Sequence, residues 1–196
     1  MLPLLATQIL WINLVTDGVP ALALGLDPVD PDVMGRSPRA RSEPVITARM
    51  WRGILFVGAI MATGTLLVLD AGLPGGLIEG SGNIDHARTM AFTTIFFYSM
   101  FNVFNARSET RSAFAGLFSN ALLWGAIALS LALQAAVLHV PFLQAAFSTT
   151  PLSAGDWLLC AATGSTVLWL RELGKLGVRL VAPAPGGPPR PAAPPQ

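Results

Sequence analysis

The stretch ILWINLVTDGVPALALGL, from Ile9 to Leu26, decides the fold class, because it is apolar and long enough to cross a membrane. Its middle is nevertheless polar, since Asn13, Thr16 and Asp17 lie within five residues of one another. A glycine and a proline follow directly, and both weaken a helix. A carboxylate at the centre of a membrane span costs about 2.5–3.5 kcal/mol. A residue retained at that cost is expected to have a function or a partner.

The composition of the whole chain also indicates an integral multi-pass membrane protein. Of its 196 residues, 53% are hydrophobic and 12% are charged, and the mean hydropathy is +0.59. Soluble domains are usually about 25% charged. The sequence contains no phosphate-cradling loop, nucleophile–base pair or nucleic-acid signature, so we expect no nucleic-acid partner. The single cysteine, Cys160, excludes an internal disulfide framework and is interpreted as a small packing residue.

Five stretches of roughly 20 mostly apolar residues predict an all-α bundle of five transmembrane helices. The predicted spans lie near residues 4–26, 53–69, 87–105, 120–138 and 157–173. The intervening segment 139–156 contains two prolines and a Ser/Thr cluster, and we expect a loop or an interfacial turn there. The predicted membrane domain covers residues 1–181 and precedes a disordered Pro-rich tail at 182–196.

The distribution of basic residues predicts how the bundle is oriented in the membrane. All but one of the 12 Lys and Arg residues lie in the loop 27–52, in the loop 106–119 or at the C-terminal end. Arg88 alone lies on the opposite side. The positive-inside rule therefore predicts a cytoplasmic C-terminus and a non-cytoplasmic N-terminus. The composition, rich in Ala, Gly and Arg, favours a bacterial cell membrane.

The polar turn of the first span offers oxygen ligands. On an α-helix Asn13, Thr16 and Asp17 share one side. Pro20 has no N–H, so the carbonyl of Thr16, four residues earlier, loses its helical partner. Hard cations take such carboxylate, amide, hydroxyl and carbonyl oxygens, and helices outside this span must complete the shell. The alternative interpretation is a satisfied interhelical pair in a span that is merely kinked by Gly18 and Pro20.

Two further stretches carry a family resemblance. LLATQILWINLVTDGVPALALGLDPVDPDVMGRSPR, residues 4–39, resembles the sixth transmembrane helix and following cytoplasmic loop of calcium-type P-type ATPases. RTMAFTTIFFYSMFNVFNARSE, residues 88–109, resembles the eighth helix of the same pumps. The resemblance covers about residues 2–180 and corresponds to helices six to ten.

The resemblance implies that Asn13, Thr16 and Asp17 ligate the transported cation. It also implies that the loop 27–49 contacts a cytoplasmic phosphorylation domain. Pumps that carry two calcium ions have a Glu in the eighth helix, and the matching position here is Ser99, which favours a single ion. The ion is expected to be Ca²⁺ or Mn²⁺, since both accept oxygen ligands.

The sequence contains no DKTGT phosphorylation motif, nucleotide-binding domain or actuator domain. This chain is therefore not expected to hydrolyse ATP alone, and its expected partners are membrane lipid and the N-terminal half of such a pump. Two functions remain open: the ion-binding C-terminal half of a calcium pump, or a catalytically silent bundle, either a truncated remnant or a structural or regulatory subunit.

Small residues gather in the second span. Gly58 and Ala62 form a small-xxx-small pair there, Gly53 and Gly64 lie nearby, and close helix packing is the natural interpretation. Acidic residues and His86 gather around the loop between the second and third spans. A solvated loop explains them better than an ion-exit mouth.

Overall fold

The computed structural model describes residues 3–27, 44, 46–76, 83–106 and 118–181. Within these ranges the side chains of Asp17, Arg49 and residues 177–181 are not described. The predicted tail at 182–196 and most of the two long basic loops lie outside the described residues, so those predictions stay predictions.

The described chain is all-α, as predicted, and contains no strand in these ranges. The first predicted span is one continuous run of helix made of three segments: α1 (Ala6–Ile12), a π-helix η1 (Asn13–Gly18) and α2 (Val19–Gly25). The remaining helices are α3 (Ala48–Gly72), α4 (Ile84–Ala106), α5 (Ala121–His139), α6 (Pro141–Phe147) and α7 (Ala154–Val181). Each predicted span thus coincides with helix, and the expected turn at 139–156 contains the short helix α6.

Local capping explains where the helices begin. Thr47 Oγ1 accepts a hydrogen bond from the backbone N–H of Met50 at 3.3 Å, which caps α3. At the start of α7, Ser153 Oγ accepts from the Asp156 N–H at 3.2 Å, and the Ser153 N–H donates to Asp156 Oδ2 at 2.9 Å. This reciprocal pair is a capping box and pins the first turn of α7.

Three helical stretches are long and apolar enough to cross a membrane: Ala6–Gly25, Met50–Gly72 and Ala121–His139. Among the described residues, α4 and α7 do not reach that standard. The polar residues of α4 are buried within the protein, among them Thr89, Thr93, Thr94 and Asn105. Because neighbouring helices cover α4, it needs less apolar surface than a helix exposed to lipid. Three of the five predicted spans are therefore helices long and apolar enough to cross a membrane, and the other two stay predictions.

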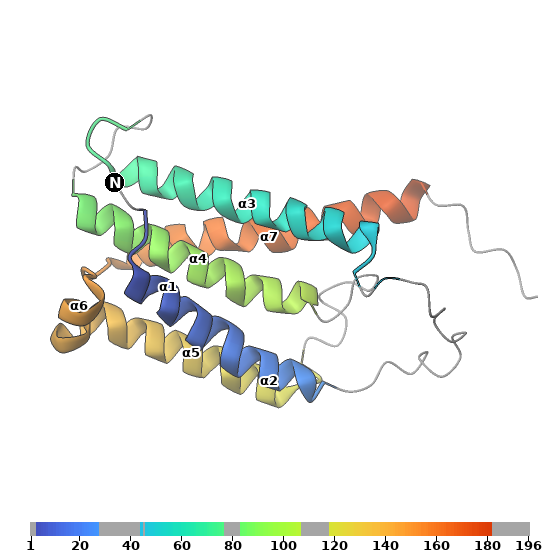
Figure 1. Cartoon of the computed structure of the whole chain (residues 1–196), viewed down its shortest axis with the longest axis horizontal. Helices are drawn as coiled ribbons and strands as arrows, with labels where there is room; N and C mark the ends of the chain where they lie inside the picture. The colour runs from blue at the N-terminus through green and yellow to red at the C-terminus, as the bar shows by residue number, and fades with distance from the viewer. Residues whose placement is uncertain (1–2, 28–43, 45, 77–82, 107–117, 182–196) are drawn as a thin grey trace, which may run out of the picture.

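α4 lies at the centre of the bundle, where α3 and α5 run antiparallel to it and the α1–α2 run and α7 run parallel to it (Figure 1). On one side α4 packs against α3 and α7, and on the other it meets α1, η1 and α5. The start of α1, the end of α3, the start of α4 and α6 lie at one end, and α2, the start of α3 and the end of α7 lie at the other (Figure 1). The described helix ends that border the basic segments in the sequence thus share one end of the bundle, and the placement of the basic loops themselves stays a prediction.

Among the small residues of α3, Gly64 rather than the Gly58–Ala62 pair packs closely against a neighbouring helix. A Cβ on Gly64 would lie 1.9 Å from the Tyr98 hydroxyl oxygen of α4. Gly58 meets no atom within 4 Å and, like Ala62, is exposed. The interpretation of the Gly58 pair as a packing site is therefore wrong within this chain, because that face of α3 points away from α4 and α7.

Candidate cation site in the first helix

The polar turn predicted from the sequence is built as a π-helix. The six residues Asn13–Gly18 form η1 between two α-helical turns. A π-helix forms hydrogen bonds from i to i+5, and such segments occur frequently at functional sites. Pro20 supplies no N–H. In the π-helical pattern the carbonyl that loses its hydrogen-bond partner is therefore that of Val15, five residues earlier, whereas in an α-helical pattern it would be that of Thr16.

Side-chain hydroxyls reach two carbonyls of this turn. Ser130 Oγ of α5 donates to the Val15 carbonyl oxygen at 3.1 Å. Thr16 Oγ1 donates to the Ile12 carbonyl oxygen at 2.7 Å. Both hydroxyl-bearing residues are buried. Hydroxyls from the same and neighbouring helices commonly satisfy backbone groups that a proline frees in a membrane helix.

The three predicted ligands have different surroundings. Thr16 is only 3% exposed and faces the interior. Asn13 is exposed on the outer surface of the bundle. The backbone of Asp17 lies in η1, and its side chain lies outside the described part. Among the described residues no group of three or more His, Cys, Asp or Glu could hold a metal ion. The assignment of Asn13, Thr16 and Asp17 as ligands stays a prediction.

A buried polar network beside the turn was not predicted from the sequence. Trp11 Nε1 donates to Gln134 Oε1 at 3.2 Å, and Gln134 Nε2 donates to Thr93 Oγ1 at 3.5 Å. Gln8 Nε2 donates to the Phe147 carbonyl oxygen at 3.1 Å. Both glutamines are fully buried. A glutamine within an apolar span is the signal that indicates such interhelical bonds.

Asn120 joins the ends of two candidate spans. Its Nδ2 donates to the Ala23 carbonyl oxygen at 2.9 Å and to Asp27 Oδ1 at 3.0 Å. Its Oδ1 accepts from the Leu123 backbone N–H at 3.0 Å, which caps α5. One amide therefore fixes the end of α2 against the start of α5, the helix whose Ser130 also bonds to the π-helical turn.

The polar residues of α4 are used for packing in the described structure. Tyr98 Oη and Thr166 Oγ1 lie 3.2 Å apart, and Asn105 Nδ2 donates to the Val167 carbonyl oxygen at 3.4 Å. These α4 residues therefore act as interhelical hydrogen-bonding groups. Ser99, at the position where two-ion pumps have a Glu, is half-buried.

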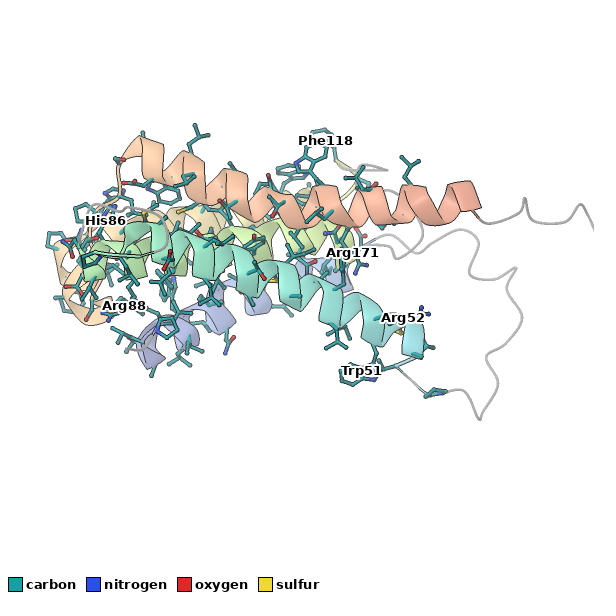
Figure 2. The ribbon with its side chains drawn as sticks, turned by 90° about the horizontal axis from the view of Figure 1, so that it is seen from above. Trp51, Arg52, His86, Arg88, Phe118 and Arg171 are labelled. Atoms are coloured by element: carbon teal, nitrogen blue, oxygen red, sulfur yellow. The ribbon has the colours of Figure 1, made fainter. Side chains whose placement is uncertain are left out.

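Charged groups meet at the end of the bundle that holds α6. His86 Nε2 lies 3.6 Å from Asp156 Oδ2, and Arg88 Nη1 lies 3.1 Å from Asp85 Oδ1 (Figure 2). Burial acts to raise the pKa of Asp156, but hydrogen bonds from Ser153 and the neighbouring His86 outweigh it and hold the pKa below 3.8. Both pairs are partly solvated, and the His86–Asp156 contact joins the starts of α4 and α7, whereas the Arg88–Asp85 pair lies within α4.

An all-α bundle in which three helical stretches can span a membrane, one of them broken by a polar π-helix, defines a polytopic helical membrane protein. A family model described as "Cation transporting ATPase, C-terminus" matches residues 1–177, and the chain belongs to this family. The resemblance seen in the sequence is confirmed.

Curated relatives are calcium-transporting ATPases from fungi, mammals and bacteria. Calcium-transporting ATPase 1 of Yarrowia lipolytica is 42% identical over 174 residues, which is 88% of this chain and 18% of that protein. Calcium-transporting ATPase type 2C member 2 of Rattus norvegicus is 39% identical over 175 residues, 89% of this chain and 18% of that protein. Calcium-transporting ATPase of Bacillus subtilis is 37% identical over 158 residues, 81% of this chain and 17% of that protein. The chain thus spans less than a fifth of their length.

Proposed function

We propose that this chain is the ion-binding C-terminal membrane half of a calcium-transporting P-type ATPase. The observation that carries the proposal is the π-helical turn Asn13–Gly18, which places polar residues and a proline-disrupted backbone in the middle of a candidate span. A broken helix at membrane depth is a recurrent way to present oxygen ligands to a cation. The calcium-transporting relatives support Ca²⁺ as the ion.

In the proposed topology all five long helical segments cross the membrane. The ends of α2 and α7 and the start of α3 face the cytoplasm, because the basic loops and the C-terminal end lie there. The cell membrane of a bacterium is the proposed location.

The proposed site uses the two faces of the turn differently. Asn13 is exposed, so its amide oxygen is available to a cation held between this helix and helices of the N-terminal half. The Thr16 hydroxyl donates a hydrogen bond to the Ile12 carbonyl oxygen, and a hydroxyl oxygen is itself an acceptor of the kind that binds a cation. Asp17 supplies the negative charge. Phosphorylation of a domain in the N-terminal half would then move the helices and release the ion on the other side of the membrane.

The test is co-expression of this chain with an N-terminal half that carries the first five helices and the cytoplasmic domains. We expect Ca²⁺-dependent phosphoenzyme formation from ATP, and Asp17→Asn is expected to abolish it. Asp85→Asn is the control, because the Asp85 side chain is 62% exposed at the far end of the bundle. Unchanged calcium dependence in Asp17→Asn would reject the ligand assignment. Failure of every complemented pair to form phosphoenzyme would favour the silent bundle.

The same assay distinguishes the ions. Replacing Ca²⁺ by Mn²⁺ over a concentration series measures which ion supports phosphoenzyme at lower concentration. If Ser99 in place of a Glu leaves only one ion site, phosphoenzyme formation is expected to depend on the calcium concentration with a Hill coefficient of about one. Cooperativity needs more than one site.

A further inference from the structure

Ser130 of α5 donates its hydrogen bond to another helix, whereas several other helical hydroxyls bond within their own helix. Thr89 and Thr94 of α4 donate to carbonyls four residues earlier, at 2.7 and 2.8 Å. Ser165 and Thr166 of α7 donate to carbonyls three residues earlier, each at 2.7 Å. Such a local bond is the common arrangement for a hydroxyl on a helix. Ser130 instead reaches the π-helical turn η1, at 3.1 Å.

The acceptor of this bond is the carbonyl that only the π-helical register deprives of a backbone donor. In an α-helical register the Val15 carbonyl would accept from the Val19 N–H. The carbonyl without a donor would then be that of Thr16, four residues before Pro20. In the π-helical register of η1 the donor to Val15 would be the nitrogen of Pro20, which carries no hydrogen. The Ser130 hydroxyl therefore stabilises the π-helical register relative to the α-helical one.

Two further contacts hold α5 against the first span, one on each side of η1 (Figure 1). Gln134, one helical turn after Ser130, accepts a hydrogen bond from Trp11 Nε1 at 3.2 Å. Asn120, at the start of α5, donates to the Ala23 carbonyl oxygen at 2.9 Å. Ser130 and Gln134 are both 0% exposed, so water does not compete for their bonds. The Ser130 hydroxyl is therefore presented to the turn from a fixed position.

We infer that Ser130 is a positioning residue for cation binding: its hydroxyl selects the backbone register from which the proposed ligands Thr16 and Asp17 extend. The inference rests on the proposed function of this turn. A binding constellation has to be held within about 0.5 Å of its productive geometry. A turn that exchanges between two registers binds the cation in only one of them. The apparent affinity then falls in proportion to the fraction of molecules in that register.

The experiment measures the Ca²⁺ concentration that gives half-maximal phosphoenzyme when the full chain is co-expressed with an N-terminal half. Ser130→Ala is expected to raise this concentration about tenfold, because a buried carbonyl loses its donor, and to leave the maximal phosphoenzyme level unchanged. Ser130→Cys keeps a weaker donor and should give an intermediate value. Thr94→Val is the matched control, because Thr94 is also 0% exposed but its hydroxyl bonds within α4. It should leave the calcium dependence unchanged.

A double-mutant cycle with Pro20→Ala separates positioning from packing. The alanine restores a backbone N–H five residues after Val15, so the Ser130 hydroxyl is no longer the donor that this carbonyl needs. In the Pro20→Ala background we therefore expect Ser130→Ala to change the half-maximal Ca²⁺ concentration less than twofold. If Ser130 only filled space, its removal would have the same effect in both backgrounds, because independent contributions add.

A second measurement does not depend on the proposed function. Amide hydrogen exchange of the chain alone in detergent, followed by mass spectrometry of peptides that cover η1, should be faster in Ser130→Ala and unchanged in Thr94→Val. Failure of the wild-type pair to form phosphoenzyme would reject the proposed function, and the exchange rates would still decide the role of Ser130. The inference is overturned by unchanged exchange in Ser130→Ala, by an unchanged calcium dependence of that variant, or by equal effects with Pro20 and with Pro20→Ala.

Discussion

Replacing Asn120 by Ala removes two kinds of hydrogen bond: one bond that caps α5, and two bonds that cross to the end of α2. The Oδ1 of Asn120 caps α5 through the Leu123 N–H, and loss of an N-cap costs about 1 kcal/mol. The Nδ2 bonds to Ala23 and Asp27 cross between helices, and such bonds average about 0.6 kcal/mol each in membrane proteins. The Ala23 carbonyl keeps a second donor, the Leu26 N–H at 3.3 Å, so no full desolvation penalty is added. The expected total loss is about 2 kcal/mol.

Asn83 provides a matched control for the capping part alone. Its Oδ1 accepts from the Asp85 N–H at 3.0 Å at the start of α4, and the residue is exposed. Asn83→Ala is therefore expected to cost about 1 kcal/mol, the value of a cap without interhelical bonds. Asn120→Asp keeps the oxygen that caps α5 but loses the two hydrogen bonds donated by Nδ2. It also brings a second carboxylate beside Asp27, so the destabilisation of this variant should decrease when low pH protonates the carboxyls.

The assay is the equilibrium unfolding free energy in mixed detergent micelles, followed by far-ultraviolet circular dichroism at increasing denaturing detergent. The reasoning predicts the order wild type, Asn83→Ala, Asn120→Ala from most to least stable. Equal losses for the two alanine variants would refute it, because the interhelical bonds of Asn120 would then contribute nothing measurable.

Two more predictions concern helix packing and pH. Gly64→Ala is expected to destabilise the protein by several kcal/mol, because the new Cβ would overlap Tyr98. Gly58→Ala adds its Cβ in open space and should stabilise α3 by up to about 1 kcal/mol. Thermal unfolding of both variants measures the two effects, and equal effects would contradict the packing role of Gly64. Asp156 has a lowered pKa, so its contribution to stability is complete above about pH 4 and is lost as the pH falls through the folded-state value. Ser153→Ala should reduce that contribution, measured as unfolding free energy against pH, and an unchanged profile would refute the role of the hydrogen bonds.

Much of the fold follows from local composition. Five apolar stretches were identified from hydropathy, and each coincides with helix, because burying backbone in an apolar medium requires every N–H and C=O to be paired within the segment. The short helix α6 also agrees with the expected interfacial turn, since its first residue is a proline. The positions of Lys and Arg in the sequence predict a single basic side, and the described helix ends that border these segments share one end of the bundle.

The site was predicted less completely. The sequence located the polar turn and its proline, but an α-helical periodicity placed Asn13 and Thr16 on one side. In the structure a π-helix changes the register, so that Thr16 is buried and Asn13 is exposed. The partner of the Val15 carbonyl is Ser130, which lies 115 residues away and carries no local signal.

By itself the sequence determined the apolar helices, their separation by polar loops, the asymmetry of charge and the polar turn with Asp17. The tertiary structure decided which face of each helix is covered, and therefore that Gly64 rather than Gly58 is the packing glycine. The physical reason is that lipid and protein interior are about equally apolar. A membrane helix can therefore be hydrophobic on all sides, and its pattern alone does not distinguish the face that meets another helix.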